Sequence, residues 1–194
     1  MDSSRTASLP TIYTARLVLR AFSEHDAGDV QRLAGDRRVA DTTAAVPHPY
    51  PDGAAVAWIV THEAAWNLGR GVTLAVTLRD TGELVGAIGL AIVPEHRSAE
   101  LGYWLGFPHW RRGYATEAAR ALIDHGFEQL DLHRIQAHHL ARNFASGRVL
   151  EKAGMQHEGL RRQAFLKWDQ FEDVREMGIL RPDWAAARLR SPAA

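Results

Sequence analysis

The sequence has no cysteine, no net charge and no hydrophobic run long enough to cross a membrane. Among 194 residues, the lack of cysteine excludes disulfides, cysteine-ligated zinc sites and thiol nucleophiles. Lysine plus arginine equals aspartate plus glutamate at 23 each, so no overall field attracts nucleic acid or an acidic membrane. The longest apolar run, 85–93, is too short to span a bilayer, and residues 1–10 lack an apolar signal core. We therefore expect a cytoplasmic protein with no nucleic-acid or membrane partner.

Length and composition indicate one globular domain. Hydrophobic residues make up 46% and charged residues 24% of the chain, which matches globular averages and argues against disorder. The chain suits a single core, and no internal repeat or domain linker interrupts it. We expect one domain over residues 1–184, followed by a flexible tail, rich in arginine and alanine, over 185–194.

Hydrophobic periodicity and turn residues predict strands and helices that alternate along the chain. We expect strands at 16–20, 72–78, 84–93, 99–105 and 134–140, a closing hairpin at 156–180, and helices at 23–33, 52–69, 115–130 and 143–153. The segment 36–51 is predicted to be a loop, because Pro47, Pro49 and Pro51 are incompatible with regular helix or a central strand. A long loop of this kind often contributes to a binding site.

The stretch 110–118 places a glycine turn between a predicted strand and a predicted helix. The first four N–H groups of a helix lack intrahelical partners, and the helix dipole adds partial positive charge at the same end. Gly113 lets the backbone approach a ligand closely, and Arg111 and Arg112 add cationic side chains. The local pattern predicts either a site for a pyrophosphate or a plain turn with solvated arginines.

Four motifs follow one another in a definite order. They are Arg16-Leu17-Val18-Leu19-Arg20, Ala99-Glu100-Leu101-Gly102-Tyr103-Trp104-Leu105, Gly113-Tyr114-Ala115-Thr116-Glu117-Ala118, and Asn143-Phe144-Ala145-Ser146 running into Leu150-Glu151-Lys152-Ala153-Gly154-Met155. In this order and spacing the chain resembles, over nearly its whole length, the GNAT acyltransferase superfamily and its RimJ/RimL-like branch. The resemblance implies an α+β fold, an α-β-α sandwich whose mixed, mostly antiparallel sheet of about seven strands has helices on both faces. It also implies that strands 99–105 and 134–140 splay, with a bulge in the first.

The resemblance implies acetyl-CoA as cosubstrate, with no metal. The superfamily holds the pyrophosphate of coenzyme A with a Q/R-x-x-G-x-G/A pattern, which falls here on 110–115 with Trp110 at the Q/R position, an aromatic departure common in the RimJ/RimL-like branch. No dinucleotide-binding or P-loop pattern competes with it. A main-chain N–H near Trp104 or Leu105 is expected to polarise the acetyl carbonyl. The expected cofactor-binding residues are Trp104, Leu105, Arg111, Arg112, Gly113, Tyr114, Ala115, Thr116 and Asn143.

Acetyl transfer to an amine needs a base for the amine and a proton for the leaving thiol. The resemblance implies Glu100 as base and Ser146 as the thiol-side residue, because the helix lacks the later tyrosine that many GNAT enzymes use as general acid. Both also have structural interpretations: Glu100 facing a cation across the sheet, and Asn143 as an ordinary N-cap with Ser146 at N3. His139 is a second candidate base, although a histidine on an apolar face is more often a core residue, which is our interpretation of His138 and His139.

The expected acceptor is a primary amine, either a protein N-terminus or a small molecule, which attacks directly in a ternary complex. The loop 47–51, the start of the Asp52 helix and the Trp168 turn are expected to line its pocket. Tyr50, Trp168 and His139 are the weaker substrate-binding candidates. Two alternatives stay open, a non-catalytic acyl-CoA-binding module and an acyltransferase that uses a larger acyl-CoA, and a homodimer is also open. Nucleic-acid binding through arginines is disfavoured by the zero net charge.

Overall fold

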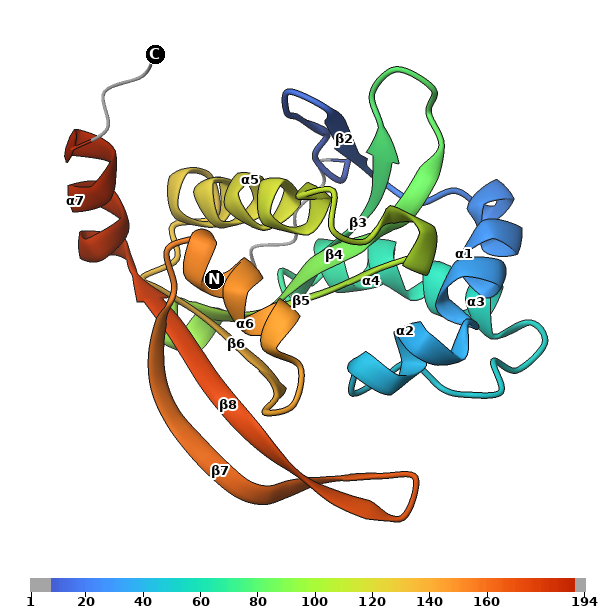
Figure 1. Ribbon diagram of the computed structural model, residues 1–194. Helices are drawn as coiled ribbons and strands as arrows, with labels where there is room; N and C mark the ends of the chain where they lie inside the picture. The colour runs from blue at the N-terminus through green and yellow to red at the C-terminus, as the bar shows by residue number, and fades with distance from the viewer. Residues whose placement is uncertain (1–7, 191–194) are drawn as a thin grey trace.

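An open sheet of eight strands forms the centre of the part of the chain that the computed structural model describes, residues 8–190 (Figure 1). The strands are β1 (Ile12–Tyr13), β2 (Leu17–Arg20), β3 (Gly71–Leu78), β4 (Leu84–Val93), β5 (Ser98–Leu105), β6 (Arg134–Leu140), β7 (Gln156–Lys167) and β8 (Gln170–Leu180). Their order is β1-β2-β3-β4-β5-β6-β8-β7, and β5 and β6 form the one parallel pair of the described sheet. The predicted mixed, mostly antiparallel sheet is confirmed, with eight strands where about seven were expected.

Helices cover both faces of this sheet, as predicted. The helices are α1 (Ala27–Ala34), α2 (Arg37–Thr42), α3 (Ala54–Ile59), α4 (Thr61–Asn67), α5 (Tyr114–Glu128), α6 (Phe144–Lys152) and α7 (Arg181–Arg190), and three 3-10 turns lie at Glu24–Asp26, Pro94–His96 and Phe107–His109. None of the helices in the described part of the chain is long and apolar enough to cross a membrane.

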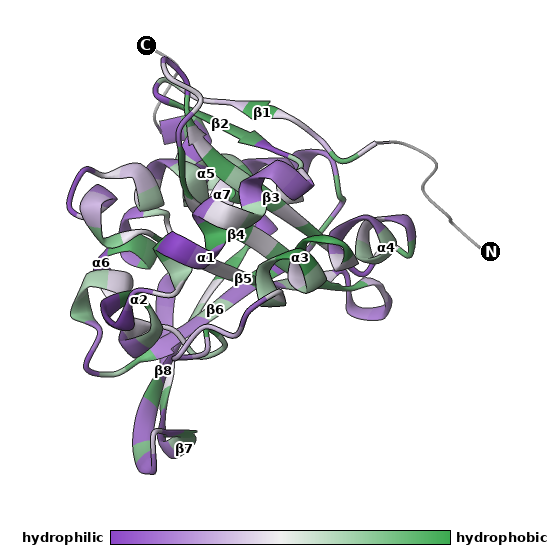
Figure 2. Cartoon of the chain, turned by 90° about the vertical axis from the view of Figure 1, so that its right-hand side faces the viewer, coloured by the Kyte–Doolittle hydropathy of each residue, from purple (hydrophilic) through white to green (hydrophobic). Residues whose placement is uncertain are grey.

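Two hydrophobic clusters, one on each face, hold the helices to the sheet. Leu122, Ile123 and Phe127 of α5 are fully buried in the larger cluster, which also includes α6. Trp104 of β5 packs with α1, α2 and α3 in the smaller cluster. Because side chains alternate along a strand, Leu101 of β5 faces the larger cluster instead. Figure 2 shows mainly hydrophobic residues on the central strands and more hydrophilic ones on the projecting β7–β8 hairpin.

Between β2 and β3 the structure differs from the prediction in two places. The predicted loop 36–51 begins with α2, because the Asp36 side chain caps this helix by accepting a hydrogen bond from the Arg38 N–H. The helix expected at 52–69 is two helices, α3 and α4, which meet at Val60. The N-cap of α3 is Gly53, at φ 75°, and not Asp52 as predicted.

The chain ends differently from the prediction. Residues 185–190, expected in a flexible tail, are the last part of α7, and residues 191–194 lie outside the described residues. Trp184 on this helix packs against Phe127 with ring centroids 5.3 Å apart, and its indole N–H donates to Asp124 at 2.6 Å. The arginine- and alanine-rich composition gave no sign of this contact, which depends on the distant helix α5. The two-residue strand β1 was also not expected, since it is too short to show a period.

The strands β5 and β6 separate after a short pairing, as predicted. They pair at Ser98 with Arg134, Ala99 with Ile135 and Glu100 with Gln136, and no further along the described strands. The predicted bulge in the strand 99–105 was wrong, because β5 pairs with β4 in unbroken register over Ser98–Leu105. The separation arises on the other side, where β6 pairs with β8 along its whole length, Arg134–Leu140, and follows it away from β5.

Candidate active site

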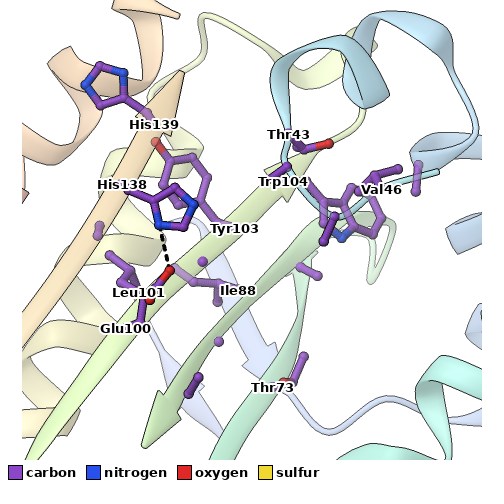
Figure 3. Close-up of a pocket in the computed structure, with 18 of the residues that line it drawn as sticks. Thr43, Val46, Thr73, Ile88, Glu100, Leu101, Tyr103, Trp104, His138 and His139 are labelled. Carbon is purple, nitrogen blue, oxygen red and sulfur yellow. Dashed lines mark ion pairs between the residues drawn. The ribbon is translucent and has the colours of Figure 1, made fainter. Parts of the chain in front are cut away.

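A cavity of about 710 Å³ opens where β5 and β6 separate (Figure 3). One part of its wall comes from β5, β6 and the start of α6. The other comes from the end of α2 and the loop after it, residues 42–47, and from helices α3 and α4. The cavity therefore joins the gap between the two strands to the space beneath the loop that precedes α3.

Glu100 and His138 form a hydrogen-bonded pair at the base of the gap. Nδ1 of His138 lies 2.7 Å from Oε1 of Glu100, and the side chains are 31% and 43% exposed, respectively (Figure 3). The hydrogen bond to His138 holds the pKa of Glu100 below its usual value, although burial opposes this effect. The same bond raises the pKa of His138. Glu100 thus stays ionised at neutral pH, and His138 becomes the stronger proton acceptor of the two.

Tyr103 and Ser146 form a second pair in the same cavity. The Tyr103 hydroxyl lies 2.8 Å from Ser146 Oγ, and either oxygen can donate. Burial raises the pKa of Tyr103 to about 12, so this phenol keeps its proton throughout the physiological range. The pair therefore holds exchangeable protons beside the gap.

Asn143 positions Ser146 through the helix start. Its Oδ1 accepts a hydrogen bond from the Ser146 N–H at 3.1 Å, and its Nδ2 donates to the Thr42 carbonyl at 3.2 Å. Asn143 is thus the N-cap of α6 and also ties that helix to the end of α2. The structural interpretation of Asn143 as an N-cap is confirmed.

His139 is buried and does not pair with Glu100, unlike its neighbour His138. His139 is 6% exposed, its Nδ1 lies 2.9 Å from the Leu140 carbonyl, and burial lowers its pKa. A Cβ on Gly147 would lie 3.0 Å from His139 Nε2, so the ring packs beneath α6. Figure 3 shows it pointing away from Glu100. The core interpretation holds for His139, which also lines the cavity, and it was wrong for His138. A role of His139 in binding the substrate stays a prediction.

The glycine turn begins α5 as predicted. Gly113 is the N-cap at φ 81°, and no side chain within residues 8–190 caps the helix. The N–H groups of Tyr114, Ala115 and Thr116, in the first turn, are therefore left for another partner. Arg111 and Arg112 are exposed beside them. This end of α5 can accept an anionic group.

Arg16, the residue directly before β2, holds the glycine turn. Its guanidinium donates to the Arg112 carbonyl at 2.9 Å and to Glu117 Oε2 at 2.7 Å, and it lies 4.8 Å from the centre of the Tyr114 ring. Glu117 also accepts from the Thr14 hydroxyl at 2.6 Å. Arg16 thus connects the start of β2 to the glycine turn. The sequence reasoning missed this role.

Trp110 occupies the position where the superfamily pattern has Gln or Arg. Its indole N–H donates to the Leu105 carbonyl at 2.7 Å. This bond ties the turn to the last residue of β5, so the aromatic side chain at this position supports the turn from inside the protein.

The structure separates the two aromatic acceptor candidates. Tyr50 lines the main cavity, where burial raises its pKa. Trp168, at the tip of the β7–β8 hairpin, lines a separate cavity of about 460 Å³. There it stacks with Arg37 at 5.0 Å and with the Lys167 ammonium at 4.8 Å. In residues 8–190 no three histidine, aspartate or glutamate side chains are grouped so as to hold a metal ion.

The sequence reasoning missed Tyr103 and the partnership of His138. Side chains alternate along 99–105, so Tyr103 lies on the same face as Leu101. A phenol hydroxyl among apolar residues was the one sign in the sequence that Tyr103 has a polar partner. His138 follows Gln136 on the face opposite Ile135 and Ala137, which indicates a polar neighbour but does not name it.

Comparisons with known proteins agree with this fold. A model of the acetyltransferase (GNAT) domain family matches residues 16–156. The chain is 33% identical over 174 residues to the uncharacterized N-acetyltransferase YoaA of Bacillus subtilis (strain 168), which covers 89% of this chain and 98% of YoaA. The chain therefore belongs to the GNAT acetyltransferase family, and it is an N-acetyltransferase of that family.

Two solved structures share the fold across almost the whole molecule. One is RimL, a ribosomal α-N-protein acetyltransferase in complex with coenzyme A, with a TM-score of 0.81, 19% identity, and coverage of 88% of this chain and 98% of RimL. The other is spermidine N-acetyltransferase from Vibrio cholerae in complex with coenzyme A and spermine, with a TM-score of 0.77, 24% identity, and coverage of 89% and 99%. At these identities the likeness is one of fold.

Proposed function

We propose that this protein transfers an acetyl group from acetyl-CoA to a primary amine by direct attack in a ternary complex. One observation carries the proposal: β5 and β6 pair over three residues and then separate, and the cavity between them contains both the Glu100–His138 pair and the Tyr103–Ser146 pair. A proton acceptor and a proton donor thus lie in one cavity, as transfer from a thioester to an amine requires.

The residues around the gap fit acetyl-CoA. The uncapped start of α5, with Gly113 and the exposed Arg111 and Arg112, suits the pyrophosphate. The Gly106 N–H bonds to β4, so alternation along β5 directs the backbone groups of Leu101, Tyr103 and Leu105 into the gap. There they can pair with the amides of the pantetheine arm.

The same alternation distinguishes the two main-chain donors expected near the acetyl carbonyl. The backbone of Trp104 faces β4, whereas the N–H of Leu105 faces the gap while its carbonyl is held by Trp110. Leu105 is therefore the better candidate to stabilise the oxygen that gains negative charge as the amine attacks.

His138 is the base in this proposal, and Glu100 is its positioning residue. His138 accepts the proton that the amine loses as its nitrogen bonds to the acetyl carbon, and Glu100 holds the ring and stabilises the imidazolium. Tyr103, through Ser146 or directly, supplies a proton to the sulfur as the carbon–sulfur bond breaks. The products are an amide and the free thiol of coenzyme A.

The test is thiol release from acetyl-CoA across a panel of peptides, amino acids, polyamines and aminoglycosides, with longer acyl-CoA donors in parallel. We expect release with at least one amine and a preference for the acetyl donor. Tight coenzyme A binding without release for any amine would instead identify a non-catalytic acyl-CoA-binding module. Faster release from a longer donor would identify a larger acyl group as the substrate.

A further inference from the structure

The floor of the cavity on the side of α3 and α4 is formed by three rows of residues that run across β3, β4 and β5. The strand register gives the rows as Gly71, Ala91 and Glu100; Thr73, Gly89 and Gly102; and Ala75, Ala87 and Trp104, of which Ala75 is fully buried and does not line the cavity. In the middle row Thr73 alone carries a side chain larger than hydrogen, because the other two residues are glycines. This row therefore leaves a channel along the sheet between the Glu100–His138 pair and Trp104.

Gly102 lies at the centre of this channel. A Cβ built on Gly102 has no heavy atom of the described chain within 4 Å beyond its neighbours. Gly89 in the same row differs, because a Cβ there would lie 2.8 Å from the Val72 carbonyl oxygen. Packing thus explains Gly89 and does not explain Gly102. A strand glycine that packing does not require is typical of a position where a ligand comes close to the backbone.

The far end of the channel is apolar and aromatic. Trp104, Tyr50 and Trp58 line the cavity there together with Val46. Figure 3 shows Trp104 and Val46 grouped apart from the Glu100–His138 pair. Glu100 and Trp104 are four residues apart on β5, which corresponds to roughly 13 Å along the strand. This length suits a small apolar body attached to an amine.

The cavity offers negative charge at one place. Among the lining residues in the described part of the chain, Glu100 is the single carboxylate, and it is already paired with His138. The lining residue Arg70 is cationic and is paired with Glu95, which does not line the cavity. In the neighbouring cavity, Asp41 and Glu172 are both paired with Arg142. A second or third ammonium group on an acceptor would therefore lose its hydration without gaining a partner.

We propose that the acceptor is a primary amine with one positive charge and an apolar body, which lies over Gly102 with its nitrogen at the Glu100–His138 pair and its body against Trp104. This inference rests on the proposed function. A free arylalkylamine and the N-terminus of a peptide with an apolar first residue share this chemistry.

The substrate class is tested by comparing kcat/KM for phenylethylamine, a tripeptide amide that begins with phenylalanine, and spermidine. At least one of the two singly charged amines is expected to exceed spermidine by about tenfold or more. The comparison of phenylethylamine with the tripeptide amide shows whether the protein prefers a free amine or the N-terminus of a peptide. Equal or better use of spermidine overturns the inference and leaves the proposed function intact. No thiol release with any amine overturns the proposed function, and the inference with it.

The place of the apolar body is tested with Gly102→Leu and the matched control Gly159→Leu. Gly159 also lies on a strand with open space around its Cβ position, but outside the cavity. Gly102→Leu is expected to raise KM for the preferred amine about tenfold or more, while Gly159→Leu leaves it unchanged. Coenzyme A affinity, measured by calorimetry, should stay within about twofold in both. An unchanged KM in Gly102→Leu overturns the placement. Gly102→Ala adds one methyl group, and should raise KM about threefold if the larger variant does not fold.

Discussion

Nδ1 of His138 and Oε1 of Glu100 lie 2.7 Å apart at the point where β5 and β6 cease to pair. The pair joins the two strands just beyond their last backbone pairing, which is Glu100 with Gln136, and it lines the cavity that their separation opens. Its position makes the protonation of His138 the first property to test.

Replacing Glu100 with Gln removes the hydrogen-bonded carboxylate, and with it the charge, that raises the pKa of His138. Because the proposed base acts when deprotonated, the rise of kcat with pH should move to lower pH in Glu100→Gln. A less basic His138 should also lower the plateau of kcat, by about 10- to 100-fold. Coenzyme A affinity should not change. The measurement is kcat against pH for both proteins.

Glu158→Gln is the control for this profile, because it breaks the ion pair of Glu158 with Arg134, and Glu158 does not line the cavity. It should reproduce the wild-type curve. A Glu100→Gln curve with wild-type turnover at every pH would exclude a role for this pair in proton transfer.

The same pair should stabilise the fold only within a limited pH range. The pKa of His138 is raised, so its contribution is complete below its usual pKa of 6.5 and is lost as pH rises through the folded value. The pKa of Glu100 is lowered, so its contribution is complete above its usual 4.5 and is lost as pH falls through the folded value. The stabilising interaction between Glu100 and His138 should therefore be strongest between about pH 4.5 and pH 6.5.

A double-mutant cycle of Glu100→Gln and His138→Gln, measured by urea unfolding, tests this range. We expect a coupling of about 0.5 kcal/mol near pH 5.5, as for a partly exposed pair, and almost none near pH 8.5. Coupling of equal size at both pH values would show that ionisation does not contribute.

Replacing Tyr103 with Phe removes the proposed proton donor and keeps the ring. We expect kcat to fall about 100-fold with little change in coenzyme A affinity. Since the pKa of Tyr103 is about 12, its deprotonation should not reduce wild-type kcat below about pH 10. The measurement is steady-state kinetics up to that pH. A Tyr103→Phe enzyme within about twofold of wild type would assign the proton to solvent.

Replacing Gly113 with Ala tests the anion site at α5. Gly113 and Gly82 have similar positive φ angles, 81° and 75°, so alanine should lower the free energy of unfolding by about 1–2 kcal/mol at either position. Gly82 lies in the β3–β4 turn outside the cavity, and Gly82→Ala is the control for backbone strain. A Cβ on Gly82 meets no atom within 4 Å, whereas one on Gly113 lies 3.3 Å from Nη2 of the flexible Arg16 side chain. Gly113→Ala should in addition weaken coenzyme A binding about tenfold, measured by calorimetry. Equal affinity in the two variants would remove the cofactor site from this turn.

Much of the fold could be predicted, because its elements have strong local patterns. The apolar positions of α5, including Leu122, Ile123 and Phe127, follow the helical period and are fully buried. Predictions failed where a local signal was weak or misleading. The prolines at 47–51 led to the prediction of a loop over the whole of 36–51, so α2 was missed although Asp36 is a good N-cap. Nothing in the sequence near Trp184 indicated that this residue would pack on α5.

The candidate site could be predicted in part for the same reason. Gly113 has a recognisable local context, whereas Ser146 and Glu100 were named through the family resemblance. The hydrogen bond between Tyr103 and Ser146 joins residues 43 positions apart, and no spacing rule connects them. His138 and Glu100 likewise meet through the pairing of two different strands.

By itself the sequence determined most of the strands and helices, the glycine turn and the family, because each depends on residues that are close together in the chain. Only the tertiary structure decided which side chains meet in the cavity. That outcome depends on β6, which pairs with β8 along its whole length and with β5 over three residues. This divergence opens the cavity, and the pairing of Glu100 with Gln136 just before it places His138, and not His139, on the face of Glu100.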